Sequence, residues 1–240
     1  MQNLKLTAVG AYCGVLTSVS FLVGIVFMAT SGVQVLIPET GGHKTLDWIA
    51  DVNDASSLFF AGAWLVILGG AFALVAILGF YEALRDAGPV MILAPVLAVV
   101  GMTLVTISHL VPIAMAYELV PRYTDASGAT QSSIGATADT FASLANVLNY
   151  AGDALLWAAV IPLLAFAILK TRAVPRWIGW LGVVTGVFAG WLGLLSPASS
   201  VLDGLTFIGF VAFFVFMASF GVALLRRRPR TEERAPVSAH

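Results

Sequence analysis

The sequence contains few charged residues, and this indicates which class of protein it belongs to. Only 10% of the residues are Asp, Glu, Lys or Arg, against about a quarter in soluble domains, while 59% are hydrophobic. The mean hydropathy is +0.95. Long polar segments are also missing, which leaves no room for a soluble domain. The composition therefore predicts an all-α, polytopic membrane protein, with the lipid bilayer as its partner and no nucleic-acid partner.

Cysteine is nearly absent as well. The single Cys13 excludes an internal disulfide, and because Tyr12 precedes it, it does not form a lipoprotein cleavage site. The apolar run around Cys13 is too long for the core of a signal peptide, so we interpret it as a retained membrane anchor.

Apolar runs of about 20 residues are the length that crosses a bilayer, and short polar hinges separate them. Residues 1–225 are predicted to form a single membrane domain, and residues 226–240 a basic and then disordered tail. The predicted spans are 6–28, 58–80, 90–114, 141–169, 177–195 and 205–225.

The distribution of Lys and Arg predicts the orientation. Of the 12 basic residues, only Lys44 and Arg122 fall in the segments on one side. The others fall on the opposite side: Lys5, Arg85, Lys170, Arg172, Arg176, Arg226, Arg227, Arg228, Arg230 and Arg234. By the positive-inside rule, both termini are cytoplasmic, and we expect a multi-pass protein of the inner (plasma) membrane.

Two outer segments are longer than a hinge. In residues 31–56, apolar Leu46 and Ile49 lie on one face of a possible short helix at the interface, with Trp48 at headgroup depth. A solvated acidic loop is the alternative. Residues 119–140 are rich in Ser, Thr, Gly and Ala, and this composition predicts a mobile outer loop.

The strongest polar pattern lies on the fourth predicted span. Side chains that recur there at helical spacing and share one face are Asn146, Asn149, Tyr150, Asp153 and Trp157. An ionised carboxylate costs a few kcal/mol or more in hydrocarbon. We therefore expect Asp153 to face the bundle interior with hydrogen-bonding partners, or to be protonated.

The third predicted span offers a partner for Asp153. His109 reaches the outer boundary of the hydrocarbon when about 20 residues are counted from Val90, and Asp153 lies at similar depth on the next span. If these spans are neighbours, one pocket opens outward between them. Tyr117 and Glu118, just beyond the third span, complete the predicted lining of this pocket, together with the shared face of the fourth span.

Each of these residues also has a purely structural interpretation. His109 can be a hydrogen-bonded structural residue, and Glu118 can be solvated at the interface. Asn146 and Asn149 can simply hydrogen-bond between helices. A purely structural role is hardest to argue for Asp153, because a carboxyl group within a span is energetically costly.

Neither a metal nor a cofactor is predicted. Bis-His haem ligation would require His43 or His240, which lie in a loop and in the tail. The segment Asp51-x-Asn53-Asp54 lacks the glycine and the distal glutamate of a calcium-binding loop.

The fifth predicted span carries a helix-packing signal. Gly182, Gly186 and Gly190 repeat every four residues, a pattern that allows another backbone to approach closely. The partner can be a span of the same chain, a second copy in a homo-oligomer, or another subunit of a membrane complex.

The segment Pro175-Arg-Trp-Ile-Gly-Trp-Leu-Gly182, before this glycine-rich span, carries a resemblance. Together with the acidic outer segment after the first span and the long fourth span, it resembles a family of uncharacterised bacterial six-span membrane proteins known as a domain of unknown function. The resemblance implies the fold and no chemistry. Relatives often have a histidine at the polar start of span four, where this chain has Asn149, Tyr150 and Asp153.

Two classes of function remain. In the first, the protein binds a small lipophilic molecule in the outward pocket or serves as an accessory subunit, which the lack of a catalytic motif favours. In the second, an intramembrane enzyme acts on a lipid or isoprenoid, with Asp153 as general acid, His109 as its partner, and Tyr150 or Trp157 stabilising a developing cation. A small transporter is a third possibility, disfavoured because no inverted repeat is visible.

Overall fold

The computed structural model describes residues 2–33, 35–41, 44–198 and 200–226. Within these ranges the chain is helical and contains no strand. Six helices are long and apolar enough to cross a membrane, which confirms the predicted fold. They are Lys5–Ser31, Ser57–Ala87, Pro89–Asp125, Gly128–Thr171, Arg176–Leu195 and Gly204–Leu225. Each predicted span lies inside one of them. The predicted tail from 227 onward and His43 lie outside the described residues.

The elements follow one another with short connections. The α-helices are α1 (Gln2–Ser31), α2 (Lys44–Asp54), α3 (Ser56–Leu84), α4 (Leu93–Asp125), α5 (Gly128–Leu155), α6 (Ile161–Thr171), α7 (Arg176–Thr185) and α8 (Ser200–Leu225). The 3-10 turns are η1 (Arg85–Ala87), η2 (Pro89–Ile92) and η5 (Gly193–Ala198), and the π-helical turns are η3 (Leu156–Val160) and η4 (Gly186–Leu192). The turn η3 joins α5 to α6 in one continuous 44-residue helix.

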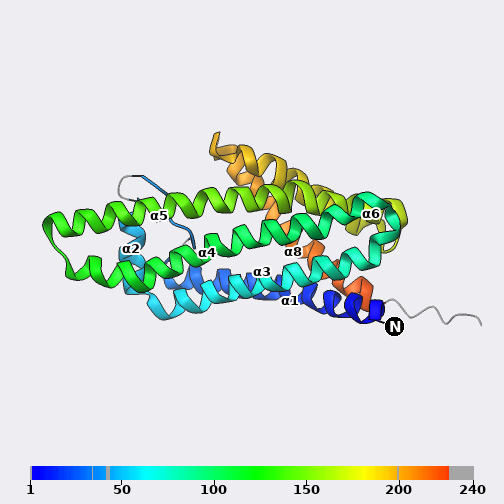
Figure 1. Ribbon diagram of the computed structural model, residues 1–240, viewed down its shortest axis with the longest axis horizontal. Helices are drawn as coiled ribbons and strands as arrows, with labels where there is room; N and C mark the ends of the chain where they lie inside the picture. The colour runs from blue at the N-terminus through cyan, green and yellow to red at the C-terminus, as the bar shows by residue number, and fades with distance from the viewer. Residues whose placement is uncertain (1, 34, 42–43, 199, 227–240) are drawn as a thin grey trace, which may run out of the picture.

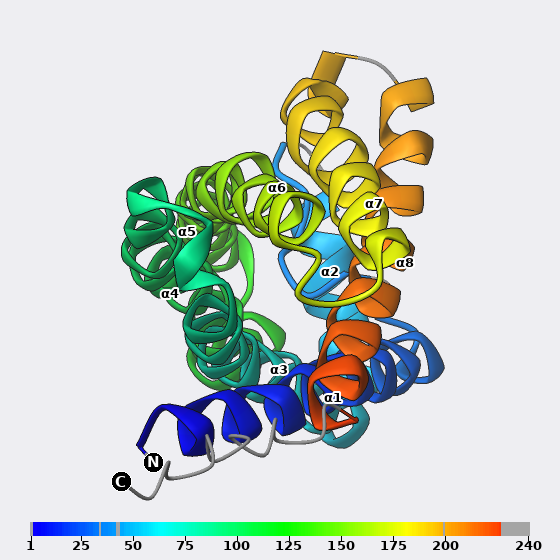
Figure 2. The same ribbon diagram turned by 90° about the vertical axis from the view of Figure 1, so that its right-hand side faces the viewer.

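The spans form a ring. In order around it, α1 packs on α3, α3 on α4, α4 on α5, the α5–η3–α6 helix on α7 and η4, and these on α8, which returns to α1. Figure 1 shows the helices side by side along the long axis, and Figure 2 shows the ring end-on with α2 behind its centre. We call the end that holds the start of α1 and the end of α8 the terminal end, and the opposite one the α2 end.

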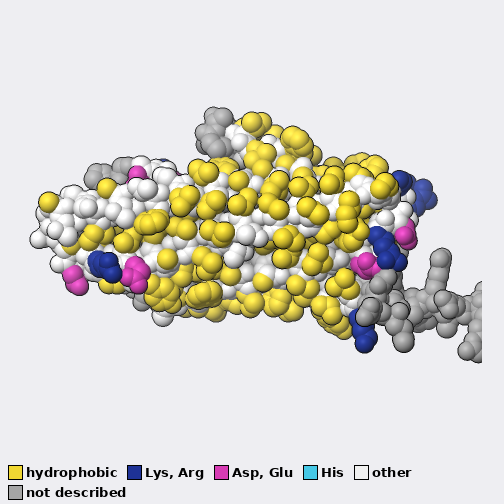
Figure 3. Space-filling view, in the orientation of Figure 1, with side chains coloured by type: hydrophobic (Ala, Val, Ile, Leu, Met, Phe, Trp, Pro, Cys, Tyr) yellow, Lys and Arg dark blue, Asp and Glu magenta, His cyan; other side chains and the backbone are white. Residues whose placement is uncertain are grey.

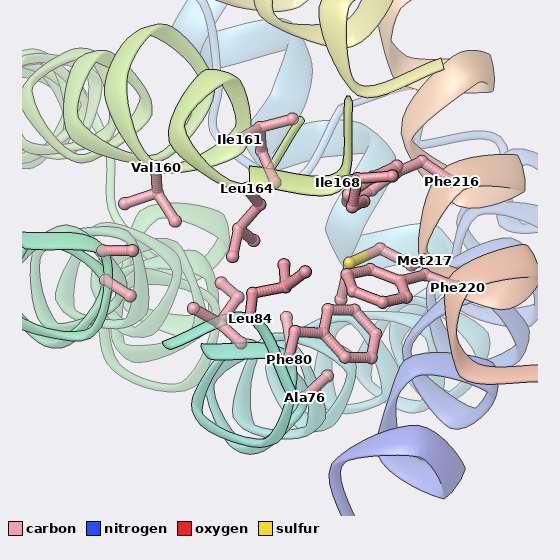
Figure 4. Close-up of a cluster of buried hydrophobic side chains, with 14 of the residues drawn as sticks. Ala76, Phe80, Leu84, Val160, Ile161, Leu164, Ile168, Phe216, Met217 and Phe220 are labelled. Carbon is pink, nitrogen blue, oxygen red and sulfur yellow. The ribbon is translucent and has the colours of Figure 1, made fainter. Parts of the chain in front are cut away.

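An apolar cluster fills the ring at the terminal end. Phe80 and Leu84 of α3 meet Leu164 of α6 and Phe216 and Phe220 of α8, and each is at most 1% exposed. The rings of Phe80 and Phe220 stack with centroids 4.0 Å apart. Figure 4 shows these side chains converging from three helices. The centre of the bundle is therefore closed at this end.

A second apolar cluster closes the α2 end. Ile49 and Val52 of α2 are each 1% exposed and pack with Phe59 of α3 and Val120 of α4, while the acidic residues of α2 face outward. The short amphipathic helix, one of the two alternatives for this segment, is thus present. The side chain of Trp48, which was expected at headgroup depth, faces the protein interior. It is 4% exposed, its indole N–H donates to the Val35 carbonyl oxygen over 3.2 Å, and its ring packs edge-on against Phe59.

The mobile outer loop predicted for 119–140 is also wrong. Helix α4 continues to Asp125 and α5 begins at Gly128, which leaves only Ala126 and Ser127 between them. This segment is helical for one local reason and one tertiary reason. Alanine has high helix propensity, and Ala138 is fully buried in the cluster beneath α2. At 1.5 Å per residue the 44-residue helix is about 66 Å long, roughly twice the hydrocarbon thickness, so α4 and α5 project beyond the bilayer.

Charged side chains separate by position along the ring. The described basic residues Lys5, Arg85, Lys170, Arg172, Arg176 and Arg226 all lie on segments at the terminal end, whereas Lys44 and Arg122 lie at the α2 end. Figure 3 shows apolar side chains covering the middle of one face and charged ones near its ends. This is the surface pattern of a protein whose long axis crosses a bilayer.

The glycines of the fifth span, Gly182, Gly186 and Gly190, pack against other helices of the same chain. A Cβ atom on Gly186 would lie 2.6 Å from Pro162 of α6, and one on Gly190 would lie 2.6 Å from the Trp157 carbonyl. Gly182 faces Ala165 and Phe216 in the same way. The close approach that these glycines permit is therefore used to join α7 and η4 to the α5–η3–α6 helix and α8.

We expect Gly190→Ala to destabilise the protein by about 1–3 kcal/mol, because the added methyl group meets backbone rather than a movable side chain. Thermal unfolding in detergent, followed by circular dichroism, measures the change. Gly204→Ala is the control, since a Cβ there meets no atom of the described residues within 4 Å. Equal melting temperatures for the two variants would contradict the assigned packing.

Candidate functional site

A cavity of about 220 Å³ lies at the centre of the ring, between the two apolar clusters. Its wall is mainly apolar, with contributions from α1, α3, α4, the α5–η3–α6 helix and α8. The polar residues on the wall are His109, Asn149, Asp153 and Trp157. Three residues of the strongest sequence pattern, Asn149, Asp153 and Trp157, therefore line one cavity, and among the described residues Asp153 is the only acid on its wall.

Both oxygens of the Asp153 carboxyl group accept hydrogen bonds. The amide of Asn149 donates to Oδ2 over 2.7 Å, and the indole N–H of Trp157 donates to Oδ1 over 2.6 Å. These donors lie one turn before and one turn after Asp153 on the same helix, at the i, i+4 spacing that brings side chains together. The sequence pattern thus predicts this local arrangement correctly.

Helix α4 supports the arrangement from the side. The Ser108 hydroxyl, which is fully buried, lies 3.3 Å from Asn149 Oδ1 and 2.7 Å from the Val105 carbonyl oxygen. The helices approach closely here because both lack side chains at the crossing. A Cβ on Gly152 would lie 2.8 Å from the Gly101 carbonyl oxygen. Close contact between backbones is a common way for membrane helices to associate.

The π-helical turn η3 begins three residues after Asp153 and contains Trp157. Such turns widen a helix locally and occur often at functional sites. Here η3 packs against the second π-helical turn, η4. From this turn the indole N–H of Trp157 donates to Asp153, and the indole ring packs edge-to-face with Phe213, with ring centroids 4.4 Å apart.

His109 lies on the wall contributed by α4, across from the carboxyl group. Within the described ranges, its ring makes no hydrogen bond and no ion pair within 4.0 Å, including with Asp153. His109 and Asp153 therefore share a cavity without touching. Because His109 lines the cavity and has no hydrogen-bond partner among the described residues, its imidazole can bond to a molecule bound there.

Aromatic rings cover the side of the cavity near Trp157. Phe213 packs edge-on against Trp157, and Phe210 lies on the same indole with centroids 5.3 Å apart. Phe21 of α1 continues the wall by packing against Phe213 and Phe214. Sequence reasoning did not assign these phenylalanines to the site. The only signal was the high phenylalanine content of the last span, because sequence spacing does not reveal which helix faces span four.

The remaining predicted pocket residues lie elsewhere. Tyr117 is 56% exposed and stacks on Phe60, and Glu118 pairs with Arg122 on the outside of α4. Tyr150 is 42% exposed on the outer face of α5. Asn146 donates to the carbonyl oxygens of Pro38 and Ala142, so it holds the segment between α1 and α2 against α5.

The site offers no metal centre. Among the residues that the structure describes, no group of three or more His, Cys, Asp or Glu side chains could hold a metal ion. One acid, one imidazole and one amide in an apolar cavity suit an organic molecule with a single polar group. A hydrated inorganic ion would lose its water there with too few replacements.

Comparison with known families adds a name for the fold and no activity. Residues 16–227 match the family model described as Domain of unknown function (DUF4386). The chain belongs to this family. Membership in DUF4386 agrees with the expected fold and resemblance. Comparisons with curated proteins and with solved structures found no match. The function of this DUF4386 protein must therefore be argued from the cavity itself.

We expect Trp157→Phe to destabilise the bundle by about 1–2 kcal/mol. It keeps an aromatic ring against Phe213 and removes the only N–H that reaches Asp153 Oδ1 among the described residues. Thermal unfolding in detergent measures the loss. Trp180→Phe is the matched control, because Trp180 is 60% exposed and has no part in the site. A loss of the same size in the control would show that the hydrogen bond contributes nothing.

Proposed function

We propose that this protein binds a small, mainly apolar molecule in the central cavity and directs the polar group of that molecule towards Asp153. The observation that supports this most directly is the cavity of about 220 Å³ whose mainly apolar wall carries a single acid. Ligand sites in proteins typically combine apolar walls with few polar groups that fix orientation. An acid at this depth is costly to maintain, which favours a functional reason for it.

Access from the bilayer supports a lipophilic ligand. Both ends of the ring are filled by apolar side chains, so entry along the ring axis is blocked. Two residues of the wall, Ile25 on α1 and Phe210 on α8, are also 44% and 36% exposed. A molecule dissolved in the lipid reaches the cavity between these helices. The polar side chains on the cavity wall then retain the molecule by its polar group.

A second function is favoured by one specific observation. Asp153 and His109 line the same cavity from different helices and leave space between them, the arrangement that a general acid and its partner require. Catalysis on a lipid or isoprenoid, with Trp157 beside the reacting group, is therefore the alternative. A role as accessory subunit would use the outer surface of the ring and would leave the cavity without a purpose.

The positions of the basic residues support one orientation in the membrane. We propose that the terminal end of the ring faces the cytoplasm and that the α2 end projects from the inner (plasma) membrane of a bacterial cell. Support comes from the concentration of Lys and Arg at the terminal end.

We expect the wild-type protein, purified in mild detergent, to retain a defined lipophilic compound that mass spectrometry detects. Glu118→Gln should retain it too, because Glu118 lies outside the cavity. Asp153→Asn and Ala73→Leu should lose it, the first by removing the acid and the second by filling space at the wall. If all four preparations are folded and contain only bulk lipid, the proposed binding function is wrong.

The orientation is testable by cysteine labelling in whole cells. In a Cys13→Ala background, we expect Ser133→Cys, on the exposed outer part of α5, to react with a membrane-impermeant maleimide. Asp86→Cys, whose native side chain is 98% exposed in the α3–α4 turn, should react only after the cells are permeabilised. The reverse labelling pattern would place the termini outside.

A further inference from the structure

The identity of the ligand can be narrowed by its charge. We infer that the central cavity takes an organic ammonium ion with an apolar body, bound between the Asp153 carboxyl group and the aromatic rings around Trp157. This inference rests on the proposed binding function and adds the chemical class of the ligand.

The first argument is the missing counter-ion. The ion pairs of the described residues involve Glu39, Glu82, Asp86 and Glu118, and none involves Asp153. Its two hydrogen bonds come from neutral groups, an amide and an indole. Neutral donors orient a carboxylate without cancelling its charge. In a site surrounded by hydrocarbon, a cationic ligand supplies the opposite charge that the protein does not.

The second argument is the aromatic wall. Trp157, which donates to Asp153, contacts both Phe210 and Phe213, and Phe213 contacts Phe21. The faces of aromatic rings attract organic cations, tryptophan most strongly, and recognition of substituted ammonium ions commonly combines several rings. A carboxyl group that is hydrogen-bonded to one ring of an aromatic cluster is the arrangement expected at a binding site for an organic ammonium ion.

The third argument is the shape and composition of the remaining wall. Met102, Val105 and Ile161 offer only apolar surface, which suits alkyl or aryl groups and no hydrated inorganic cation. His109 faces the same space and has no hydrogen-bond partner in the described part of the chain. A neutral imidazole nitrogen there can accept the ammonium N–H.

The test compares two probes of nearly the same shape that differ in charge. N,N-dimethylbenzylamine is an ammonium ion at neutral pH, and isobutylbenzene is its uncharged analogue. Both are titrated calorimetrically at pH 7 into the full-length protein in lipid nanodiscs. We expect the ammonium ion to bind the wild type at least about ten-fold more tightly than isobutylbenzene, because only the ion meets the opposite charge of the acid.

The variants separate charge from shape. Asp153→Asn should abolish the preference while changing the affinity for isobutylbenzene less than about two-fold, and Asp153→Glu should keep part of the preference. Phe213→Leu should weaken ammonium binding about five-fold through the lost ring. Asp139→Asn, far from the cavity on the outer part of α5, is the control and should behave like the wild type.

Two results would overturn the inference. Equal binding of both probes to the wild type, or an ammonium preference that survives in Asp153→Asn, would show that the acid does not recognise charge and would leave the binding of apolar molecules intact. No binding of either probe to folded wild type would reject the ammonium site and the proposed binding function together.

Discussion

A carboxyl group inside a membrane-spanning bundle must be given hydrogen bonds by its surroundings, and much of this structure is arranged around that need. Asn149 and Trp157 donate to Asp153 from the turns on either side, and α4 comes close enough for Ser108 to contact Asn149. That approach depends on the lack of side chains at Gly101 and Gly152. The hydrogen bonds of Asp153 thus depend on how α4 and α5 cross. They also involve the span that contains η4, since η4 packs on the π-helical turn that carries Trp157.

The cavity persists because the ring is closed on both sides of it. Large side chains such as Phe80 and Phe216 fill the terminal end, and α2 brings Trp48 and Ile49 into the other end. Between these tightly packed ends, the side chains on the wall do not fill the centre of the ring. A space of about 220 Å³ remains next to the acid, with a mainly apolar wall. Such a site selects its ligand by solubility in lipid first and by polar contacts second.

The arrangement also explains which sequence patterns were informative about the site. Residues one helical turn apart stay together whatever the tertiary structure, so the contacts among Asn149, Asp153 and Trp157 follow from spacing alone. Tyr150 shares the same stretch, yet it is exposed, because the width of the buried face depends on how α4 packs against α5 there. The expectation that His109 shares a pocket with Asp153 rested on counting depth in the bilayer, which is a strong constraint in membrane proteins.

Composition, hydropathy and the placement of charge determined by themselves that this is a helical membrane protein with six spans, because a bilayer imposes the length and apolar character of each span on the sequence directly. The helical spacing around Asp153 determined the local hydrogen bonds. Only the tertiary structure decided that 119–140 is helical, that Trp48 is buried, and that phenylalanines of α1 and α8 complete the site. Those features depend on contacts between segments distant in the chain, and no local pattern of residues encodes which segments meet.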